Sequence, residues 1–313
     1  PSMKNIYKGN EESGITRIEA PIEGCWINLI DPTTDEIDSI KALGVPSDFL
    51  TYALDLDERP RTEKEDDGTT LIMLSIPFFQ GEKFDVPFST IPLGIILTDS
   101  MVITVCKKNN VIMDELLRTR SKGISTAKRV RFILRILLIT ATQYLSYLRE
   151  INHTVEIVED RLQASMRNKE VMELLKYQKS LVYFTTALRS NELMMERLKK
   201  TPLFHRFPED EDLLEDVLTE NQQAIEMVGI ASNILSSMMD AFASIISNNL
   251  NVVMKFLASI TIVLSIPTIV TSFYGMNVDL PLQQNPLAFL WIIAILAVLS
   301  MVVVFIFIRR DWF

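Results

Sequence analysis

The sequence has 313 residues, of which 48% are hydrophobic and 23% are charged, and its net charge is −9. Its mean hydropathy of +0.20 is high for so charged a chain, so the apolar residues must be concentrated in one part of it. Two cysteines and two histidines leave no basis for a soft-metal site, no nucleophile–base constellation or phosphate loop indicates an enzyme, and we expect no nucleic-acid partner.

Residues 1–124 form the first predicted domain, a mixed α/β domain. A helix is predicted over 32–44, because Asp31 precedes a proline at its start and Gly44 stops it. Four runs rich in Val, Ile, Thr and aromatic residues, each bounded by Gly, Pro, Asp or Gln, predict strands at 24–30, 69–79, 92–99 and 101–106.

Residues 125–207 change character to long helices. The stretches 125–167 and 169–200 carry apolar residues at intervals of three and four, have many charges four residues apart, and contain no Pro or Gly. They predict an antiparallel helical pair, after which two prolines in 201–210 turn the chain.

A single long helix is predicted from about Glu209 to Phe273, interrupted only by Gly229 and Pro267. At about 1.5 Å per residue it would be roughly 100 Å long. A helix of that length needs support from copies of itself or from other helices. Its first part, 208–255, is predicted to be a stalk.

The stalk is acidic. No Lys or Arg occurs from 207 to 254, whereas nine Asp or Glu residues do. Their summed charge of −9 equals the net charge of the whole chain. They would raise the cation concentration at the cytoplasmic mouth of a membrane pathway, and the alternative is a solvated helix face. These acids are Glu209, Asp210, Glu211, Asp212, Glu215, Asp216, Glu220, Glu226 and Asp240.

Two uncharged apolar stretches, 256–273 and 287–308, follow the stalk. About 20 apolar helical residues span a bilayer core, so both are predicted to cross the membrane. The first can extend past Lys255, whose long side chain can reach the head groups. The alternative is a buried hairpin of a soluble protein.

Positive charge predicts the orientation of these two spans. The connecting loop, 274–286, has no Lys or Arg, whereas Lys255 precedes the first span and the basic tail, 309–313, follows the second. By the positive-inside rule, both termini are cytoplasmic and the loop faces outward. We therefore expect a multi-pass protein of the plasma or inner membrane.

A polar stripe runs along the predicted long helix at the spacing of a coiled-coil seam. Eight of its ten residues are polar and none is large and branched, whereas a closed seam would be built from Leu, Ile and Val. The alternative is a surface for close helix packing. The residues of the polar stripe are Asp240, Ser244, Ser247, Asn251, Met254, Ala258, Thr261, Ser265, Thr268 and Ser272.

The polar stripe predicts a water-filled pore made by several chains, because one stripe cannot enclose a channel and closed rotational symmetry is required. Asn251 would give a ring of neutral amides. Met254, with Leu257 beside the stripe, would give an apolar constriction that stops ions by dewetting. Asp240 could hold a cation on the cytoplasmic side.

The residues between the two spans resemble a known family. Gly275-Met276-Asn277, preceded by Tyr274 and followed by an acidic loop, one more span and the tail RRDWF, resembles the CorA family of divalent-cation channels. The stretch NVVMKFL at 251–257 is similar to the inner pore of that family, and LDERPRTE at 56–63 to its N-terminal signature. The resemblance is strongest over 208–313.

The resemblance implies a fold, an assembly and roles for residues. The fold is an α+β cytoplasmic domain with long stalk helices and a two-helix transmembrane hairpin, assembled as a symmetric homopentamer in the lipid bilayer. Asn277 would form the selectivity ring, supported by Gly275 and Met276, and Asp240 would line the stalk pore. Asp216 would bind regulatory Mg²⁺ between subunits, and Asp85 and Glu82 are candidates for its partner acid.

Two positions depart from the family pattern. Pro267 stands one residue later than expected relative to Tyr274, and Ser265 stands where an apolar pore residue is expected. We therefore expect a polar upper gate in place of a second hydrophobic constriction.

The chemistry of Mg²⁺ agrees with an amide filter. The ion sheds water reluctantly, so neutral amides that bind its hydration shell can admit it and release it. Gly275 would let the backbone turn sharply beside the filter.

The resemblance therefore implies a channel that passes hydrated Mg²⁺ down its electrochemical gradient, with Co²⁺ and Ni²⁺ as further ions, and that intracellular Mg²⁺ closes. Mg²⁺ would then be both the transported and the regulatory ion. One alternative is a ZntB-like Zn²⁺ transporter, with or without proton coupling. Another is a membrane-anchored sensor or scaffold.

Overall fold

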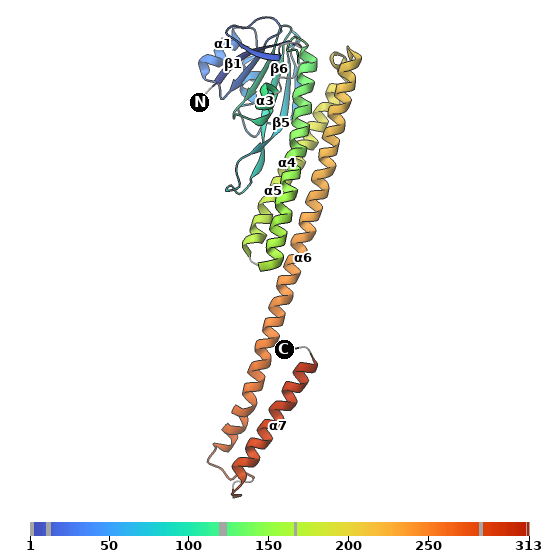
Figure 1. Ribbon diagram of the computed structural model, residues 1–313. Helices are drawn as coiled ribbons and strands as arrows, with labels where there is room; N and C mark the ends of the chain where they lie inside the picture. The colour runs from blue at the N-terminus through green and yellow to red at the C-terminus, as the bar shows by residue number, and fades with distance from the viewer. Residues whose placement is uncertain are drawn as a thin grey trace. The chain divides into compact units, whose positions relative to one another are not determined.

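The computed structural model describes residues 3–10, 14–118, 124–165, 168–281, 284–310 and 312 (Figure 1). Parts of the predicted loop (282–283) and of the predicted tail (311 and 313) lie outside the described residues. The chain divides into two compact units, Pro1–Ser237 and Met238–Phe313, called here the N-terminal unit and the C-terminal unit.

A seven-stranded sheet forms the centre of the N-terminal unit, in the order β2-β1-β3-β7-β6-β5-β4. Neighbouring strands are antiparallel except β3 and β7, which are parallel. The strands are β1 (Met3–Asn10), β2 (Gly14–Ile18), β3 (Trp26–Ile30), β4 (Arg61–Lys64), β5 (Thr70–Phe79), β6 (Phe88–Leu97) and β7 (Val102–Cys106).

The four predicted strand runs correspond to β3, β5, β6 and β7, although β6 begins earlier than predicted, at Phe88. The strands β1, β2 and β4 were not predicted. They lie toward the two edges of the sheet and keep much of their surface only half-buried, so their sequences lack a continuous apolar run.

Alternate residues of the sheet enter two apolar cores, because successive strand residues point to opposite faces. On one face, Leu71 and Met73 pack with residues of the short helices α1 (Thr34–Lys41) and α2 (Ser47–Tyr52). On the other, Ile72 and Leu74 share a core with the longer helices.

The start of α1 differs from the prediction. Thr33, and not Asp31, is the N-cap: its hydroxyl accepts from Glu36 N at 3.3 Å, and Glu36 Oε2 accepts from Thr33 N at 2.8 Å. Asp31 instead follows β3 with a φ of 46° and pairs with Lys107 at 2.7 Å. That ion pair holds the pKa of the Asp31 carboxyl below its usual value.

Helices α4 (Arg129–Ser165) and α5 (Asn168–Lys199) are the predicted pair, and they run in opposite directions (Figure 1). They follow α3 (Val111–Arg118). Both are fixed to β5 at Ser75. Tyr144 Oη and Asn191 Nδ2 donate to the Ser75 carbonyl at 2.9 and 2.7 Å, and Ser75 N donates to Asn191 Oδ1 at 2.9 Å.

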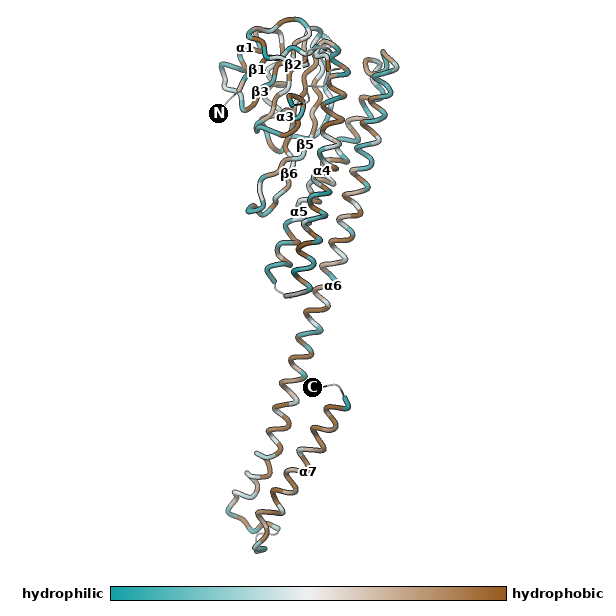
Figure 2. The backbone as a smooth tube through the Cα atoms, viewed as in Figure 1, coloured by the Kyte–Doolittle hydropathy of each residue, from teal (hydrophilic) through white to brown (hydrophobic). Residues whose placement is uncertain are grey.

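A short 3₁₀ turn, Pro202–His205, leads into α6 (Pro208–Tyr274), and α7 (Ala288–Arg309) ends the fold. Both helices agree with the prediction to within one or two residues. Each is long and apolar enough to cross a membrane, and 6% of the apolar window of α6 and none of that of α7 is buried. A buried soluble hairpin would show the opposite, so these surfaces suit a lipid environment (Figure 2).

Candidate ion pathway

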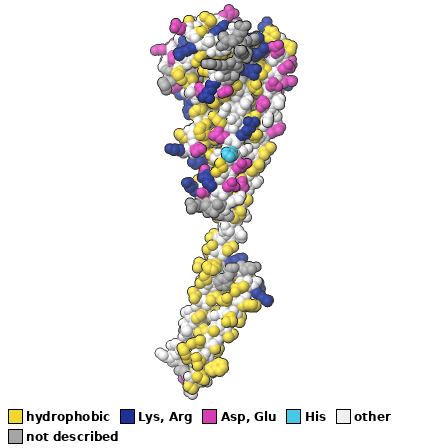
Figure 3. Space-filling model, viewed as in Figure 1, with side chains coloured by type: hydrophobic (Ala, Val, Ile, Leu, Met, Phe, Trp, Pro, Cys, Tyr) yellow, Lys and Arg dark blue, Asp and Glu magenta, His cyan; other side chains and the backbone are white. Residues whose placement is uncertain are grey.

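The polar stripe lies on the surface of α6. Nine of its ten residues are exposed in the single chain and Ser265 is half-buried. Met254 and Leu257, the predicted constriction, are each 57% exposed. Apolar side chains cover much of the C-terminal unit around these residues, whereas charged side chains lie mainly on the N-terminal unit (Figure 3). The stripe is therefore available to other copies of the chain.

Three hydroxyl groups of the polar stripe, those of Thr261, Ser265 and Thr268, donate their protons within α6. Thr261 Oγ1 donates to the Leu257 carbonyl at 2.8 Å, Ser265 Oγ to Thr261 at 2.7 Å, and Thr268 Oγ1 to Leu264 at 3.0 Å. A hydroxyl whose proton is used in this way still has lone pairs that accept hydrogen bonds. The stripe therefore offers acceptors to whatever lies beside it.

Hydroxyl groups away from the stripe serve the helix itself. Ser259, which is fully buried, donates to the Lys255 carbonyl at 2.8 Å. Thr271 donates to Pro267 at 2.8 Å and to Thr268 at 3.1 Å. Such side-chain bonds help a proline to be tolerated in an apolar environment, and α6 continues through Pro267.

The Gly275-Met276-Asn277 triplet directly follows the end of α6. Gly275 N donates to the carbonyls of Thr271 at 2.9 Å and Ser272 at 3.2 Å. Tyr274 Oη donates to the Pro281 carbonyl at 3.2 Å, which ties the helix end to the loop. Asn277 is exposed, and Met276 is 50% exposed.

The chain turns at Gly275, directly after the end of α6, but not through a left-handed backbone. Its φ is not among the positive values of the described glycines, so no left-handed turn requires it. A Cβ at this position would instead lie 3.3 Å from the Thr271 carbonyl oxygen, the same oxygen that accepts the Gly275 N–H. Glycine therefore permits a close approach of the backbone at the helix end.

The predicted regulatory acids do not meet in one chain. Asp216 and Asp240 are exposed on α6. Asp85 Oδ2 pairs with Lys179 Nζ at 2.6 Å, and this hydrogen bond holds the pKa of the Asp85 carboxyl below its usual value. Within the part of the chain that the structure describes, no group of three His, Cys, Asp or Glu residues could hold a metal ion. Asp216 therefore shares no three-ligand group with other acids among the described residues.

Not all of the stalk acids are free to attract cations. Asp210 is 4% exposed and accepts from Arg131 Nε at 2.8 Å, and Glu209 accepts from Arg131 Nη2 at 2.5 Å. These bonds, led by that to Asp210, raise the pKa of Arg131. No local pattern indicates this contact, because Arg131 lies on α4, far from Glu209 and Asp210 along the chain.

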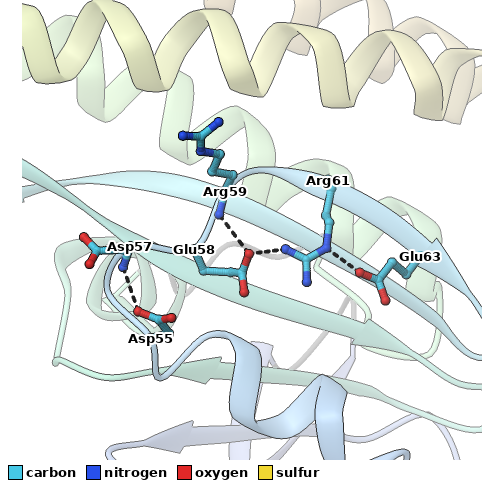
Figure 4. Close-up of polar contacts among 6 residues, drawn as sticks. All are labelled: Asp55, Asp57, Glu58, Arg59, Arg61 and Glu63. Atoms are coloured by element: carbon cyan, nitrogen blue, oxygen red, sulfur yellow. Dashed lines mark hydrogen bonds and ion pairs between the residues drawn. The ribbon is translucent and has the colours of Figure 1, made fainter.

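The residues of the signature at 56–63 contact one another and the end of α2 within the single chain. Arg61, on β4, binds both Glu58 and Glu63 (Figure 4). Its guanidinium also lies 4.8 Å from the ring centre of Tyr52 on α2. Glu58 Oε1 also accepts from Arg59 N at 3.2 Å. These contacts hold the edge strand against the segment that follows α2.

Comparisons with known proteins agree with this arrangement. Residues 23–310 match the family described as CorA-like Mg²⁺ transporter protein. The cobalt/magnesium transport protein CorA of Methanocaldococcus jannaschii is 32% identical over 294 residues, which are 92% of this chain and 90% of that protein.

Solved structures show the same fold. The complete structure of the CorA magnesium transporter from Methanocaldococcus jannaschii matches with a TM-score of 0.86, 27% identity and 99% coverage of both chains. The ZntB cytoplasmic domain from Vibrio parahaemolyticus matches with a TM-score of 0.61 and 13% identity over 78% of this chain and 98% of that one, a likeness of fold alone. The resemblance seen in the sequence is confirmed: the chain belongs to the CorA family of magnesium transporters, whose members are ion transporters and not enzymes.

Proposed function

We propose that this protein is a membrane channel that passes hydrated Mg²⁺ down its electrochemical gradient. The observation that carries the proposal is the polar stripe, which is exposed on an apolar helix and offers hydrogen-bond acceptors. A hydrated Mg²⁺ ion presents the hydrogens of its water shell, and the ion gives up that shell reluctantly. Acceptors along the path can therefore bind the shell without removing it.

The assembly that we propose is a closed ring of identical chains, a homopentamer as in the family that the sequence resembles. The stripe of one α6 cannot surround water, and rotational symmetry brings one stripe from each chain to the axis. Asn251 then contributes a ring of amides. Met254 and Leu257 contribute the apolar constriction at which the channel closes.

The filter that we propose is the ring of Asn277 amides in the outward loop. Gly275 supports it through the close approach of the backbone to Thr271, and Met276 lies between them. Neutral amides bind the hydration shell weakly enough for the ion to leave. We expect both termini to be cytoplasmic, which places this ring at the outer mouth.

The gate that we propose responds to intracellular Mg²⁺ bound by acids of neighbouring chains. Asp216 is suited to this role because it is exposed and no described hydrogen bond or ion pair engages it. Asp85 can take part only after its ion pair with Lys179 breaks. We therefore expect replacement of Asp216 to impair Mg²⁺-dependent closure more than replacement of Asp85.

Ion flux into proteoliposomes tests the proposal. We expect Mg²⁺ influx without a pH gradient, weaker Co²⁺ influx, and loss of both in Asn277→Ala. Asn285→Ala is the matched control, because Asn285 lies in the same loop but its amide oxygen accepts from Leu287 N at 2.9 Å at the start of α7. Zn²⁺ influx that requires a pH gradient, without Mg²⁺ influx, would instead support the ZntB-like alternative.

A further inference from the structure

One face of α6 forms a buried apolar seam in the N-terminal unit. Its residues alternate at intervals of three and four, the spacing of a coiled-coil seam, and none is more than 6% exposed. Six of the seven are apolar: two Leu, two Val and two Ala. The residues of this α6 seam are Leu214, Val217, Asn221, Ala224, Val228, Ala231 and Leu235.

Asn221 is the polar exception, and its side chain is only partly satisfied. Its Nδ2 donates to the backbone carbonyl of Leu188 on α5 at 3.3 Å. Its Oδ1 is buried and has no hydrogen-bond donor among the described residues. Because Asn221 is 1% exposed, neither bulk water nor a second copy of the chain can supply that donor while α6 stays in place.

An unsatisfied buried amide oxygen is destabilising, so another effect must favour asparagine over an apolar residue. A single asparagine in a helix seam fixes the register of the two helices at a cost in stability. The other six residues of the α6 seam are all buried and apolar, so they distinguish neighbouring registers only by shape and not by a specific partner. The Leu188 carbonyl meets the amide in one register alone.

We propose that Asn221 is a positioning residue for transport: it fixes the register along α5 of α6, the helix that also carries the polar stripe. This inference rests on the proposed function. Asn221 and Asp240 belong to one continuous helix, and a slip of one turn at Asn221 is a shift of about 5.4 Å along the axis of that helix. Rings of side chains from separate chains must stay level to form a constriction, and a fixed register keeps them level.

A second contact between α5 and α6 allows the register to be measured. Gln178 Nε2, on α5, donates to Ser236 Oγ, on α6, at 3.1 Å. A cysteine pair at Gln178 and Ser236 reports the native register. A pair at Val182 and Ser236 reports a shift by one turn, because Val182 lies one turn along α5 and is 58% exposed. The native Cys25 and Cys106 are fully buried and do not interfere.

The test compares disulfide formation in these two pairs in the full-length protein, with and without Asn221→Val. We expect the shifted pair to gain about tenfold relative to the native pair. We also expect the melting temperature to rise by about 2–4 °C and Mg²⁺-dependent closure of flux to weaken. Disulfides between neighbouring chains are separated by their mass, and Val228→Ile is the control at the equivalent seam position.

The combination of higher stability and weaker gating is what a purely structural asparagine would not produce. An unchanged ratio of the two pairs, with or without a change in melting temperature, would overturn the inference. Should Asn221→Val fail to fold, Asn221→Thr also removes the link to Leu188. The disulfide ratio is measured without transport, so absence of Mg²⁺ flux in the parent protein would overturn the proposed function and leave the register inference to its own result.

Discussion

Helix α6 carries two lines of residues with the same spacing and opposite chemistry. The α6 seam, in the N-terminal unit, is buried and apolar except at Asn221, whereas the polar stripe, which begins three residues into the C-terminal unit, is exposed and mostly polar. The spacing therefore identifies a helix face in both regions, but only the composition indicates what covers it. The seam packs within its own chain, and the stripe is left for an assembly and for water.

The largest expected effect is a loss of stability on replacing a residue of the α6 seam, compared with a residue of the polar stripe. Leu214→Ala should reduce the free energy of unfolding by about 2–5 kcal/mol, because Leu214 is 1% exposed and truncation leaves a cavity. Met254→Ala should change it by less than about 0.5 kcal/mol, because Met254 is 57% exposed. Thermal unfolding of both variants measures the difference. Equal losses would contradict the assignment of the two faces.

The next effect concerns the ion pair of Asp210, which lies one turn before the first residue of the α6 seam. Arg131→Gln should reduce the free energy of unfolding by about 1.5–3 kcal/mol, because the Asp210 carboxylate stays buried without its charged partner. Arg161→Gln is the control, since its ion pair with Glu173 is more exposed. Denaturant titration separates the two. A comparable loss in both variants would argue against a special role for the Arg131 contact.

A change in the stripe should affect transport and leave folding intact. Replacing Thr261 and Thr268 together by Ile removes two acceptors, worth about 1–3 kcal/mol in total, so Mg²⁺ flux should fall about 10–100-fold. Thr271→Ile, on the same helix but off the stripe, should retain more flux. Stopped-flow uptake into liposomes measures both. If the off-stripe variant loses more flux than the double variant, the stripe does not line the path.

The smallest expected effect is at the corner between α5 and α6. His205 Nδ1 lies 3.2 Å from Glu211 Oε1, and its Nε2 meets the backbone carbonyl of Lys199. Both partners are acceptors, so the protonated ring can donate to both, and the carbonyl of Lys199 and then Glu211 raise the pKa of His205. The stabilisation is present below the ordinary pKa of about 6.5 and is lost as the pH rises through the raised value.

Hydrogen exchange of the 200–207 backbone between pH 5.5 and 8.5 tests this contact. We expect protection to decrease with rising pH in the parent protein and to be independent of the His205 charge in His205→Gln. Protection that increases with pH would contradict the proposed protonation.

Local signals in the sequence were enough for much of the fold. Hydropathy predicted α6 and α7, and apolar runs predicted the central strands. The strands β1, β2 and β4 were missed because the edges of the sheet keep polar residues half-buried. The N-cap at Thr33 was missed because Asp31, two residues earlier, is an equally good N-cap residue.

For the candidate site too, the sequence indicates the local patterns but not the contacts between residues distant along the chain. The polar stripe and the triplet at 275–277 are local patterns on one helix and its end. The pairing of Asp210 with Arg131 and of Asp85 with Lys179 joins residues distant in sequence, so charge counting along the chain could not find it. The Leu188 partner of Asn221 was hidden in the same way, because it is a backbone carbonyl.

The central claim is that the polar stripe faces water while the rest of the membrane part of α6 faces lipid or protein. Cysteine accessibility in the assembled, membrane-embedded protein tests it most directly, with a membrane-impermeant thiol reagent against Thr261→Cys, Thr268→Cys, Leu264→Cys and Ile269→Cys. We predict reaction at the two threonine positions and little at Leu264 and Ile269, although these are 64% and 57% exposed in the single chain. Equal reactivity at all four positions, or the reverse preference, would contradict a water-filled path along the stripe.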